Sequence, residues 1–356
     1  MSLPDDTDLA GAVDDVLTRA AAEDHYSGVV RLEHGDELVY EGAYGVASRR
    51  WEVPVHAGMR FDLASVTKLF TSVAVLQQVD AGTLDLDASI AEWVDLAGTG
   101  ISTEITLRHL LTHTSGIADD ADEEAGESYE ALFVDRPNYA VMRTEDFLPQ
   151  CTGKPALFAP GTGCRYNNCG YQFAGLALEK VTGASYREYV QAEVFTRAGM
   201  TASGFFDMRH AEPDVAEGWE PVRADERTVG WRQNIYSYPP IGAPDGGAHC
   251  TAGDLVRFMH AVRGGELLSA ERTELFLTPQ VVHNEADGYT VTYGFGLVFE
   301  VLPDGRLRDF YKEGINVGAS AIVEHYPAQD VTLALVANSE NGIWGPLKQI
   351  DKLVYG

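Results

Sequence analysis

The fold is decided at residues 61–82, which read FDLASVTKLFTSVAVLQQVDAG. Ser65 lies where a loop enters a segment with helical apolar spacing, and Gly82 follows that segment as glycine often follows a helix. The pattern predicts a helix over residues 65–81. Because residues three apart in a helix share a face, we expect the hydroxyl of Ser65 and the amine of Lys68 to meet.

The pair Ser65 and Lys68 predicts nucleophilic catalysis. A serine hydroxyl is a poor nucleophile until a neighbouring base removes its proton, and a lysine amine can be that base. The start of a helix adds positive potential and free backbone N–H groups, which suit a developing oxyanion. The alternative is a capping serine followed by a surface lysine. The rest of the sequence decides between the two interpretations.

Two later motifs favour catalysis. Tyr166 and Asn168 form a Y-x-N pattern in the helical middle of the chain. A tyrosine can shuttle protons when cations lie nearby, and an asparagine amide can bond both a lysine and a substrate amide. Lys312, Glu313 and Gly314 lie on a predicted strand, where the lysine adds positive charge and the glycine permits close approach. The three motifs in this order and context are stronger evidence than any one alone.

Both ends of the chain predict strands, and the middle predicts helices. Two alternating runs flank a turn at residues 34–36, the last quarter alternates again, and residues 83–280 carry mostly helical spacing. This predicts an α+β fold, with an antiparallel sheet flanked by helices and a mostly helical domain. We expect residues 1–64 and 281–356 to form the discontinuous sheet domain, residues 65–280 the helical domain, and the active site to lie between them.

The sequence resembles the serine β-lactamase and penicillin-recognising superfamily, in particular the branch of class C β-lactamases, D-stereospecific peptidases and family VIII esterases. The wider group carries S-x-x-K and K-T-G signatures. The resemblance runs from about residue 25 to residue 345. It is carried by the segments FDLASVTKLFTSVAVLQQVDAGTLDLDASI, ITLRHLLTHTSGI, PGTGCRYNNCGYQFAGLALEKVTG and GGAHCTAGDLVRFMHAV. It implies a β-lactamase-like fold.

The resemblance also implies roles for individual residues. Ser65 would be acylated, and Lys68 and Tyr166 would share the role of base. The oxyanion hole would use the backbone N–H groups of Ser65 and Ile315. The positions implied to bind substrate or oxyanion are Asn168, Lys312, Gly314 and Ile315.

Glu313 departs from the family pattern, because many relatives have a threonine or serine there that helps to hold a substrate carboxylate. A carboxylate repels an anionic substrate and could attract an amine. We therefore expect a hydrolase of esters, amides or D-amino-acid peptides. The alternatives are a β-lactamase or DD-peptidase-like penicillin-binding protein, an acyltransferase, and a catalytically quiet module that binds peptidoglycan-like ligands.

Residues 205–245 are rich in Trp, Tyr, Pro and Gly and lie between the second and third motifs. Their position predicts a wall of the cleft, with Tyr236 and Tyr238 in an acyl-group pocket. The alternative is a packed long loop.

No cofactor or metal is expected. His109 and His113 have the i, i+4 spacing of helix ligands but lack the H-E-x-x-H pattern, so we expect structural roles. The acidic run at residues 119–124 lacks the spacing of a calcium loop and predicts a solvated loop near the cleft.

The composition excludes several partners. The chain has 356 residues, 54 acidic against 26 basic, and a net charge of −28. Such a protein lacks the basic surface that nucleic acids and anionic membranes require, and no apolar run approaches the roughly 20 residues of a spanning helix. We expect a small-molecule or short-peptide substrate, and leave the oligomeric state open.

Four cysteines, at positions 151, 164, 169 and 250, are too sparse for a disulfide framework. We expect reduced thiols, with a local bridge between Cys164 and Cys169 as the alternative. The opening residues have neither the basic segment nor the apolar core of a secretory signal. This favours a cytoplasmic location, with export by a leader outside the given sequence as the alternative.

Overall fold

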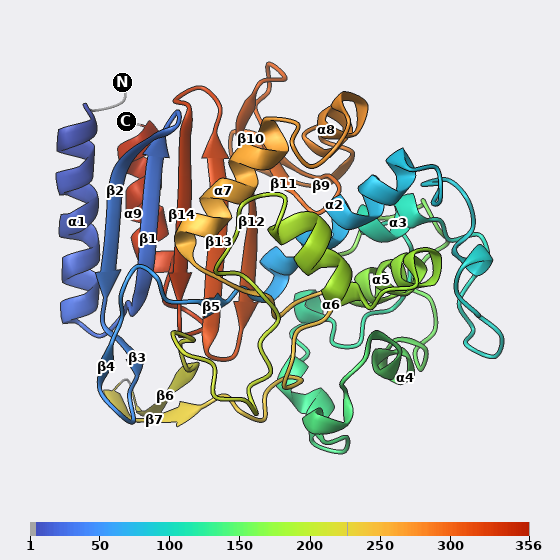
Figure 1. The fold of residues 1–356 in the computed structure, drawn as a ribbon, viewed down its shortest axis with the longest axis horizontal. Coiled ribbons are helices and arrows are strands. Elements are labelled where there is room, and N and C mark those ends of the chain that lie inside the picture. The colour runs from blue at the N-terminus through green and yellow to red at the C-terminus, as the bar shows by residue number, and fades with distance from the viewer. Residues whose placement is uncertain (1–4, 226, 356) are drawn as a thin grey trace.

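The architecture comes from a computed structural model that describes residues 5–225 and 227–355. Within these residues, eight strands form one antiparallel sheet in the order β2-β1-β14-β13-β12-β11-β10-β9. The sheet combines strands from both ends of the chain (Figure 1), which confirms the predicted α+β fold. Its strands are β1 (Gly28–His34), β2 (Glu37–Tyr44), β9 (Val281–Ala286), β10 (Tyr289–Tyr293), β11 (Val298–Val301), β12 (Leu307–Asn316), β13 (Ala319–Tyr326) and β14 (Val331–Ala337).

The central strands are apolar on both faces, because helices cover both. Every residue of β13 and β14 is buried. In β1, Val29 packs into the core on one side of the sheet and Val30 into the core on the other. α1 (Asp6–Ala22) and α9 (Trp344–Tyr355) cover the side of Val30, and α7 (Ala252–Arg263) covers the opposite side (Figure 1). The two ends of the chain therefore supply helices as well as strands to the sheet region.

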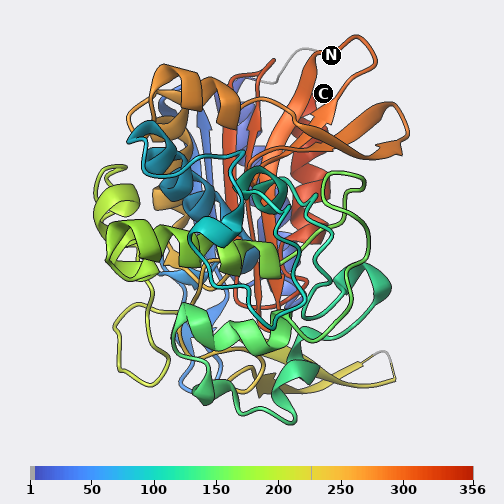
Figure 2. The same ribbon diagram turned by 90° about the vertical axis from the view of Figure 1, so that its right-hand side faces the viewer.

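The middle of the chain supplies the remaining helices. They are α2 (Thr67–Asp80), α3 (Leu107–Leu111), α4 (Leu148–Cys151), α5 (Cys169–Thr182), α6 (Tyr186–Tyr189) and α8 (Ala270–Phe276). The residues of α2 from Thr67 to Gln77 are all buried, because this helix packs against α5, α8 and the π-helical segment Val190–Phe195. Figure 2 shows this helical part in front of the sheet. No helix within the described residues is long and apolar enough to span a membrane.

The middle of the chain is not entirely helical. The described residues form three further two-stranded sheets, of which β6 with β7 lies in the middle, β5 with β8 has one strand there, and β3 with β4 precedes it. Their strands are β3 (Val46–Ser48), β4 (Val53–Pro54), β5 (Phe61–Asp62), β6 (Trp219–Ala224), β7 (Arg227–Gln233) and β8 (His249–Cys250).

The sequence predicts a mostly helical middle, and the hairpin of β6 and β7 is a part of it that forms strands. This hairpin is largely exposed, so it lacks the regular apolar alternation that marks a half-buried strand. α7 also lies in the middle of the sequence but packs on β14 and β1. The predicted boundary at residue 280 therefore does not separate the helices that cover the sheet from the others.

A disulfide joins Cys151 at the end of α4 to Cys169 at the start of α5, whereas Cys164 and Cys250 are free. The Cα atoms of the bonded pair lie 5.4 Å apart, within the usual bridging range. The expectation of reduced thiols is wrong for this pair, and so is the alternative bridge from Cys164. The reason is that the loops between the two helices bring their ends together, which the spacing of cysteines along the sequence does not reveal.

Candidate active site

Ser65 lies on a short turn in front of α2. The chain leaves β5, forms the 3-10 turn η1 (Ala64–Val66) and continues into the helix. Ala64 has a φ of 44°, in the left-handed region that residues other than glycine rarely adopt. Its backbone N donates to Asp62 Oδ1 at 2.7 Å, and its carbonyl accepts from Thr67 Oγ1 at 2.7 Å. These bonds hold the turn, and the turn presents Ser65 at the start of the helix.

Lys68 is completely buried one helical turn after Ser65. Its Nζ donates to Ser65 Oγ at 3.1 Å, to Asn168 Oδ1 at 2.7 Å and to the carbonyl oxygen of Asp245 at 2.7 Å. An ammonium group has three N–H donors, and these three acceptors match them. A cation removed from water needs such partners because the loss of hydration is costly. Three separate segments thus fix the Lys68 amine beside the serine.

Tyr166 contacts the same serine from the segment that precedes α5. Its hydroxyl donates to Ser65 Oγ at 2.7 Å. The ammonium nitrogens of Lys68 and Lys312 each lie 5.0 Å from the centroid of the Tyr166 ring. Two positive charges at this distance stabilise negative charge that develops on the phenol oxygen. The structure therefore brings the first residues of all three sequence motifs together.

β12 passes directly against the turn that carries Ser65, and Gly314 permits this approach. A Cβ atom on Gly314 would lie 2.1 Å from the carbonyl oxygen of Leu63 and 2.9 Å from the backbone N of Ser65. Only a residue without a side chain fits at that position. Ile315 follows with an exposed side chain and lines the cavity in front of Ser65.

Lys312 is buried, and its Nζ lies 3.4 Å from Glu313 Oε1. The side chain of Glu313 is 32% exposed, and its Oε2 has no hydrogen-bond partner within the described residues. Burial, and next the charge of Glu313, raise the pKa of the Tyr293 phenol. The Glu313 carboxylate therefore lies at the site, where it offsets part of the positive charge of Lys312.

His113 is a neighbour of Tyr166 that the motifs do not reveal. Its ring centroid lies 4.7 Å from that of Tyr166 and 5.0 Å from that of Tyr293. Its Nδ1 accepts from the backbone N of Asn167 at 3.1 Å, and burial, followed by the charges of the two site lysines, lowers its pKa well below the usual range. His109 instead caps the start of α3. These contacts agree with the structural roles expected for both histidines.

The acidic run is not a solvated loop at its first two residues. Asp119 and Asp120 are both buried. Asp119 Oδ1 accepts from the backbone N of Asn168 at 2.8 Å and of Cys169 at 2.9 Å, and so caps the start of α5. Burial, followed by the charges of Asp119 and Asp245, raises the pKa of Asp120 well above its usual range. The expectation fails here because both carboxylates are buried and that of Asp119 bonds the backbone of the second motif.

Asp119, Asp120 and Cys169 also form the one group of described residues whose donor atoms lie close enough together for a metal ion. The sulfur of Cys169 is in a disulfide and cannot act as a thiolate ligand. The donor chemistry therefore does not fit a metal site.

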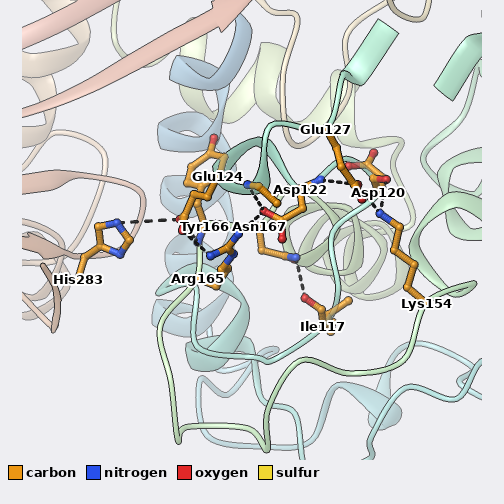
Figure 3. A network of polar contacts seen from close by, with 11 residues as sticks. Ile117, Asp120, Asp122, Glu124, Glu127, Lys154, Arg165, Tyr166, Asn167 and His283 are labelled. Atoms are coloured by element: carbon orange, nitrogen blue, oxygen red, sulfur yellow. Dashed lines mark hydrogen bonds and ion pairs between the residues drawn. The ribbon is translucent and has the colours of Figure 1, made fainter. Parts of the chain in front are cut away.

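The rest of the acidic run folds against the backbone of Tyr166 (Figure 3). Arg165 pairs with Asp122 at 2.6 Å and with Glu124 at 3.0 Å. Glu124 Oε1 accepts from the backbone N of Tyr166 at 3.2 Å and lies 4.0 Å from His283 Nε2. These contacts position the tyrosine, and no spacing in the sequence indicates them.

A cavity of about 340 Å³ opens in front of Ser65. Residues of the predicted wall, 205–245, form much of its lining, together with apolar side chains from β5 and the loops before α5. Tyr238 lines the cavity, and its hydroxyl accepts from Asn234 Nδ2 at 2.5 Å. Tyr236 is 73% exposed and does not belong to the lining. The structure thus places one of the two predicted pocket tyrosines at the cavity and the other outside it.

A β-lactamase-like sheet and helices, with a serine flanked by a buried lysine and a tyrosine, define the class of serine hydrolases. The β-lactamase family model matches residues 13–351, and the chain belongs to the β-lactamase family. This confirms the resemblance inferred from the sequence.

Related proteins agree with this membership. A penicillin-binding protein from Bacillus halodurans has a solved structure that is 35% identical, with a TM-score of 0.87 over 94% of this chain and 99% of that one. Esterase EstB from Burkholderia gladioli is 30% identical over 322 residues, 84% of this chain and 82% of EstB. Penicillin-binding protein 4* from Bacillus subtilis is 25% identical over 345 residues, 91% of this chain and 71% of that protein. The protein is a serine hydrolase of the β-lactamase family.

Proposed function

We propose that Ser65 is the nucleophile and forms an acyl-enzyme, with Lys68 and Tyr166 as the groups that move its proton. The observation that carries this proposal is that Lys68 Nζ at 3.1 Å and the Tyr166 hydroxyl at 2.7 Å both contact Ser65 Oγ. For the serine proton to leave, one of these neighbours must be in its basic form. The close contacts support either Lys68 or Tyr166 as the base. In both cases the base then gives the proton to the leaving group.

The reaction has two halves. Ser65 Oγ attacks the carbonyl carbon of an ester or amide, its proton passes to the neighbouring base, and the leaving alcohol or amine departs with that proton. Water then attacks the acyl-enzyme, releases the acid and returns the proton to Ser65. We propose the backbone N–H groups of Ser65 and Ile315 as the oxyanion hole, which the tight approach of Gly314 to Ser65 N supports. Asn168 would hold Lys68 and the substrate amide.

The substrates that we propose are esters, amides and D-amino-acid peptides that are neutral or cationic. Glu313 Oε1 lies 3.4 Å from Lys312 Nζ and weakens the positive charge available to a substrate carboxylate. We therefore expect poor hydrolysis of the cephalosporin nitrocefin relative to p-nitrophenyl acetate. A higher kcat/KM for nitrocefin than for the ester would favour the alternative of a β-lactamase or a DD-peptidase-like protein.

The test of the nucleophile is labelling with a fluorophosphonate, read by intact-protein mass. Ser65→Ala should abolish both the adduct and ester hydrolysis. Ser72→Ala is the matched control, because Ser72 lies on the same helix and contacts Tyr171 at 3.4 Å. Labelling that survives Ser65→Ala at another residue would refute the assignment.

Two other outcomes correspond to the remaining alternatives. Product analysis with an added alcohol or amine acceptor detects an acyltransferase, because the acceptor then replaces water. A stable acyl adduct without turnover, seen by mass, indicates a binding module. The presence of all the motif side chains around Ser65 supports an enzyme over a binding module.

A further inference from the structure

The two proposed donors of the oxyanion hole come from separate segments, so their spacing has to be fixed by other contacts. The backbone N of Ser65 belongs to the turn η1, and that of Ile315 lies near the end of β12. Donors stabilise an oxyanion when they are held in place before the reaction, and a displacement of about 1 Å can cost roughly a hundredfold in rate. Side chains that connect the two segments therefore bear on the reaction without contacting the substrate.

Asp62 holds the turn that carries Ser65. Its side chain is buried, and its Oδ1 accepts from the backbone N of Ala64 at 2.7 Å. Ala64 has a φ of 44°, a costly conformation that needs such a fixed partner. Burial, followed by the charge of Asp62 and a hydrogen bond between the two side chains, raises the pKa of the Tyr238 phenol well above its usual range. The phenol therefore keeps its proton and donates to the Asp62 carboxylate.

Asn234 connects Tyr238 to the segment that carries the second donor. Asn234 follows β7 and is 4% exposed. Its Nδ2 donates to the Tyr238 hydroxyl at 2.5 Å and to the carbonyl oxygen of Val317 at 2.7 Å. Val317 lies between β12 and β13, two residues after Ile315. An amide nitrogen has two N–H donors, and these two acceptors use both. One amide group thus joins the wall of the cavity to the end of β12.

Two glycines leave the space that the Asn234 amide occupies. A Cβ atom on Gly218 would lie 2.0 Å from Asn234 Nδ2, and one on Gly318 would lie 2.5 Å from it. The backbone N of Asn234 also donates to the carbonyl oxygen of Gly218 at 3.2 Å. Only residues without side chains fit on both sides of the amide. This close packing holds the amide in one place, as a group that positions others must be held.

We propose that Asn234 and Tyr238 are positioning residues that fix the distance between the two oxyanion donors, the backbone N–H groups of Ser65 and Ile315. Each acts through the backbone of a neighbouring segment and does not contact the oxyanion. When the bonds of Asn234 are lost, the turn η1 and the end of β12 can move independently, and the donors leave the place where the oxyanion forms. This inference rests on the proposed function, because it needs the oxyanion that attack by Ser65 creates.

The experiment compares p-nitrophenyl acetate with its thiono ester, in which sulfur replaces the carbonyl oxygen. Sulfur is a weak hydrogen-bond acceptor, so the oxyanion hole should accelerate the thiono ester much less than the oxygen ester. The readout is the ratio of kcat/KM for the oxygen ester to that for the thiono ester, within each variant. A smaller folded fraction lowers both rates and leaves the ratio unchanged, whereas displaced donors lower the ratio.

The variants separate the connection between the segments from the general support of the wall. Asn234→Ala removes both bonds of the amide, and Tyr238→Phe removes only the hydroxyl. Asn138→Ala is the matched control, because Asn138 is also buried and its Nδ2 donates to the carbonyl oxygens of Ile235 at 2.9 Å and Tyr238 at 2.7 Å. Both of these bonds end on the wall of the cavity, so this variant loosens the wall alone.

We expect Asn234→Ala to lower the ratio by about tenfold, a part of the roughly hundred- to thousandfold loss that follows removal of a whole donor. Tyr238→Phe should lower it by about threefold, because the bond from Asn234 to Val317 remains. Asn138→Ala should leave the ratio within about twofold of wild type. An unchanged ratio in Asn234→Ala or in Tyr238→Phe, or a fall in Asn138→Ala as large as in Asn234→Ala, overturns the proposal.

Tyr238→Phe covers the case in which Asn234→Ala does not fold, because it keeps the aromatic ring. Its ratio then decides alone, and a fall supports the proposal whereas an unchanged ratio overturns it. The proposed function fails separately, if Ser65→Ala still hydrolyses p-nitrophenyl acetate. If the wild type hydrolyses the ester through Ser65 and Asn234→Ala keeps the wild-type ratio, only the inference about the positioning residues fails.

Discussion

The two faces of the sheet bury charge in different ways. On the face toward α2, the cations Lys68 and Lys312 are buried together with carboxylates, and the lysine nitrogen atoms lie beside fixed acceptors or a carboxylate. The carboxylates buried near Lys68 are Asp119, Asp120 and Asp245. On the face toward α9, the buried charges are mainly carboxylates. They are Glu300, Asp309, Glu324 and Asp351, with Arg308 among them.

Burial raises the pKa of each carboxylate on the α9 face. Glu300 and Asp309 are opposite each other in the pairing of β11 with β12, where like charges repel. Burial, followed by the charge of Glu300, raises the pKa of Asp309 to about 7, and burial raises that of Glu324 well above its usual range. Tyr355 of α9 donates to Asp309, and Tyr326 donates to Asp351.

The difference indicates separate roles for the two faces. Around Ser65, several segments hold each charge at a fixed place, which is the preorganisation that a catalytic site requires. On the α9 face, the charge changes with pH, and with it the stability of helix docking. Substitutions on the first face should therefore change the rate, and substitutions on the second should change how stability depends on pH.

The largest effect is expected for Lys68→Met, which removes the buried cation beside Ser65. We expect kcat/KM for p-nitrophenyl acetate to fall by about 10³-fold or more, because a base is lost and the serine loses a fixed partner. The acceptors on Asn168 and Asp245 also lose their donor, so the melting temperature should fall as well. Lys180→Met, at an exposed position of α5, is the control. Activity above a tenth of wild type would contradict the role of Lys68.

A smaller loss of rate is expected for Gly314→Ala, which pushes β12 away from the turn that carries Ser65. The new Cβ would lie 2.1 Å from the carbonyl oxygen of Leu63, so the strand must shift. Overpacking of this kind costs about 1–3 kcal/mol, and we expect kcat/KM to fall by roughly ten- to hundredfold. Gly230→Ala on β7 is the matched control, because no atom lies within 4 Å of the position that its Cβ atom would take. Equal activity of the two variants would show that the approach of β12 does not matter.

Asp309→Asn tests the α9 face. The raised pKa means that the folded state keeps a proton that the unfolded state loses above its ordinary pKa of 3.8. The contribution of protonated Asp309 to the free energy of unfolding is therefore fully present below about pH 4. It is lost as the pH rises through about 7, at roughly 1.4 kcal/mol per pH unit.

Denaturant unfolding between pH 5 and pH 8 measures this slope. Wild type should lose stability as the pH rises, and Asp309→Asn should lose less, with kcat/KM at pH 7 within about twofold of wild type because Asp309 lies outside the site. Asp287→Asn, at an exposed position, should keep the wild-type slope. If the slope of stability against pH in Asp309→Asn equalled that of wild type, residues other than Asp309 would cause the pH dependence of stability.

The sequence predicts the charged residues on the face toward α2 better than those on the face toward α9. Ser65 and Lys68 are one helical turn apart, so local geometry alone brings them together. The order of the motifs indicates Tyr166 and Lys312, because short motifs carry recognisable chemistry. The carbonyl of Asp245 and the neighbours of Asp309 carry no such signal, because backbone acceptors and cross-strand partners are fixed only when distant segments pack.

The smallest effect is expected for Glu313→Gln, which leaves Lys312 without its neighbouring anion. This substitution increases the difference in charge between the two faces of the sheet. The ammonium of Lys312 then offers more positive charge to a substrate carboxylate. We expect the kcat/KM for nitrocefin, divided by that for p-nitrophenyl acetate, to rise by about three- to tenfold, the effect of one partly exposed charge. Glu41→Gln is the control, because its side chain is 29% exposed and pairs with Arg31 on β1, far along the sheet. An unchanged ratio in Glu313→Gln would mean that Glu313 does not limit the use of anionic substrates.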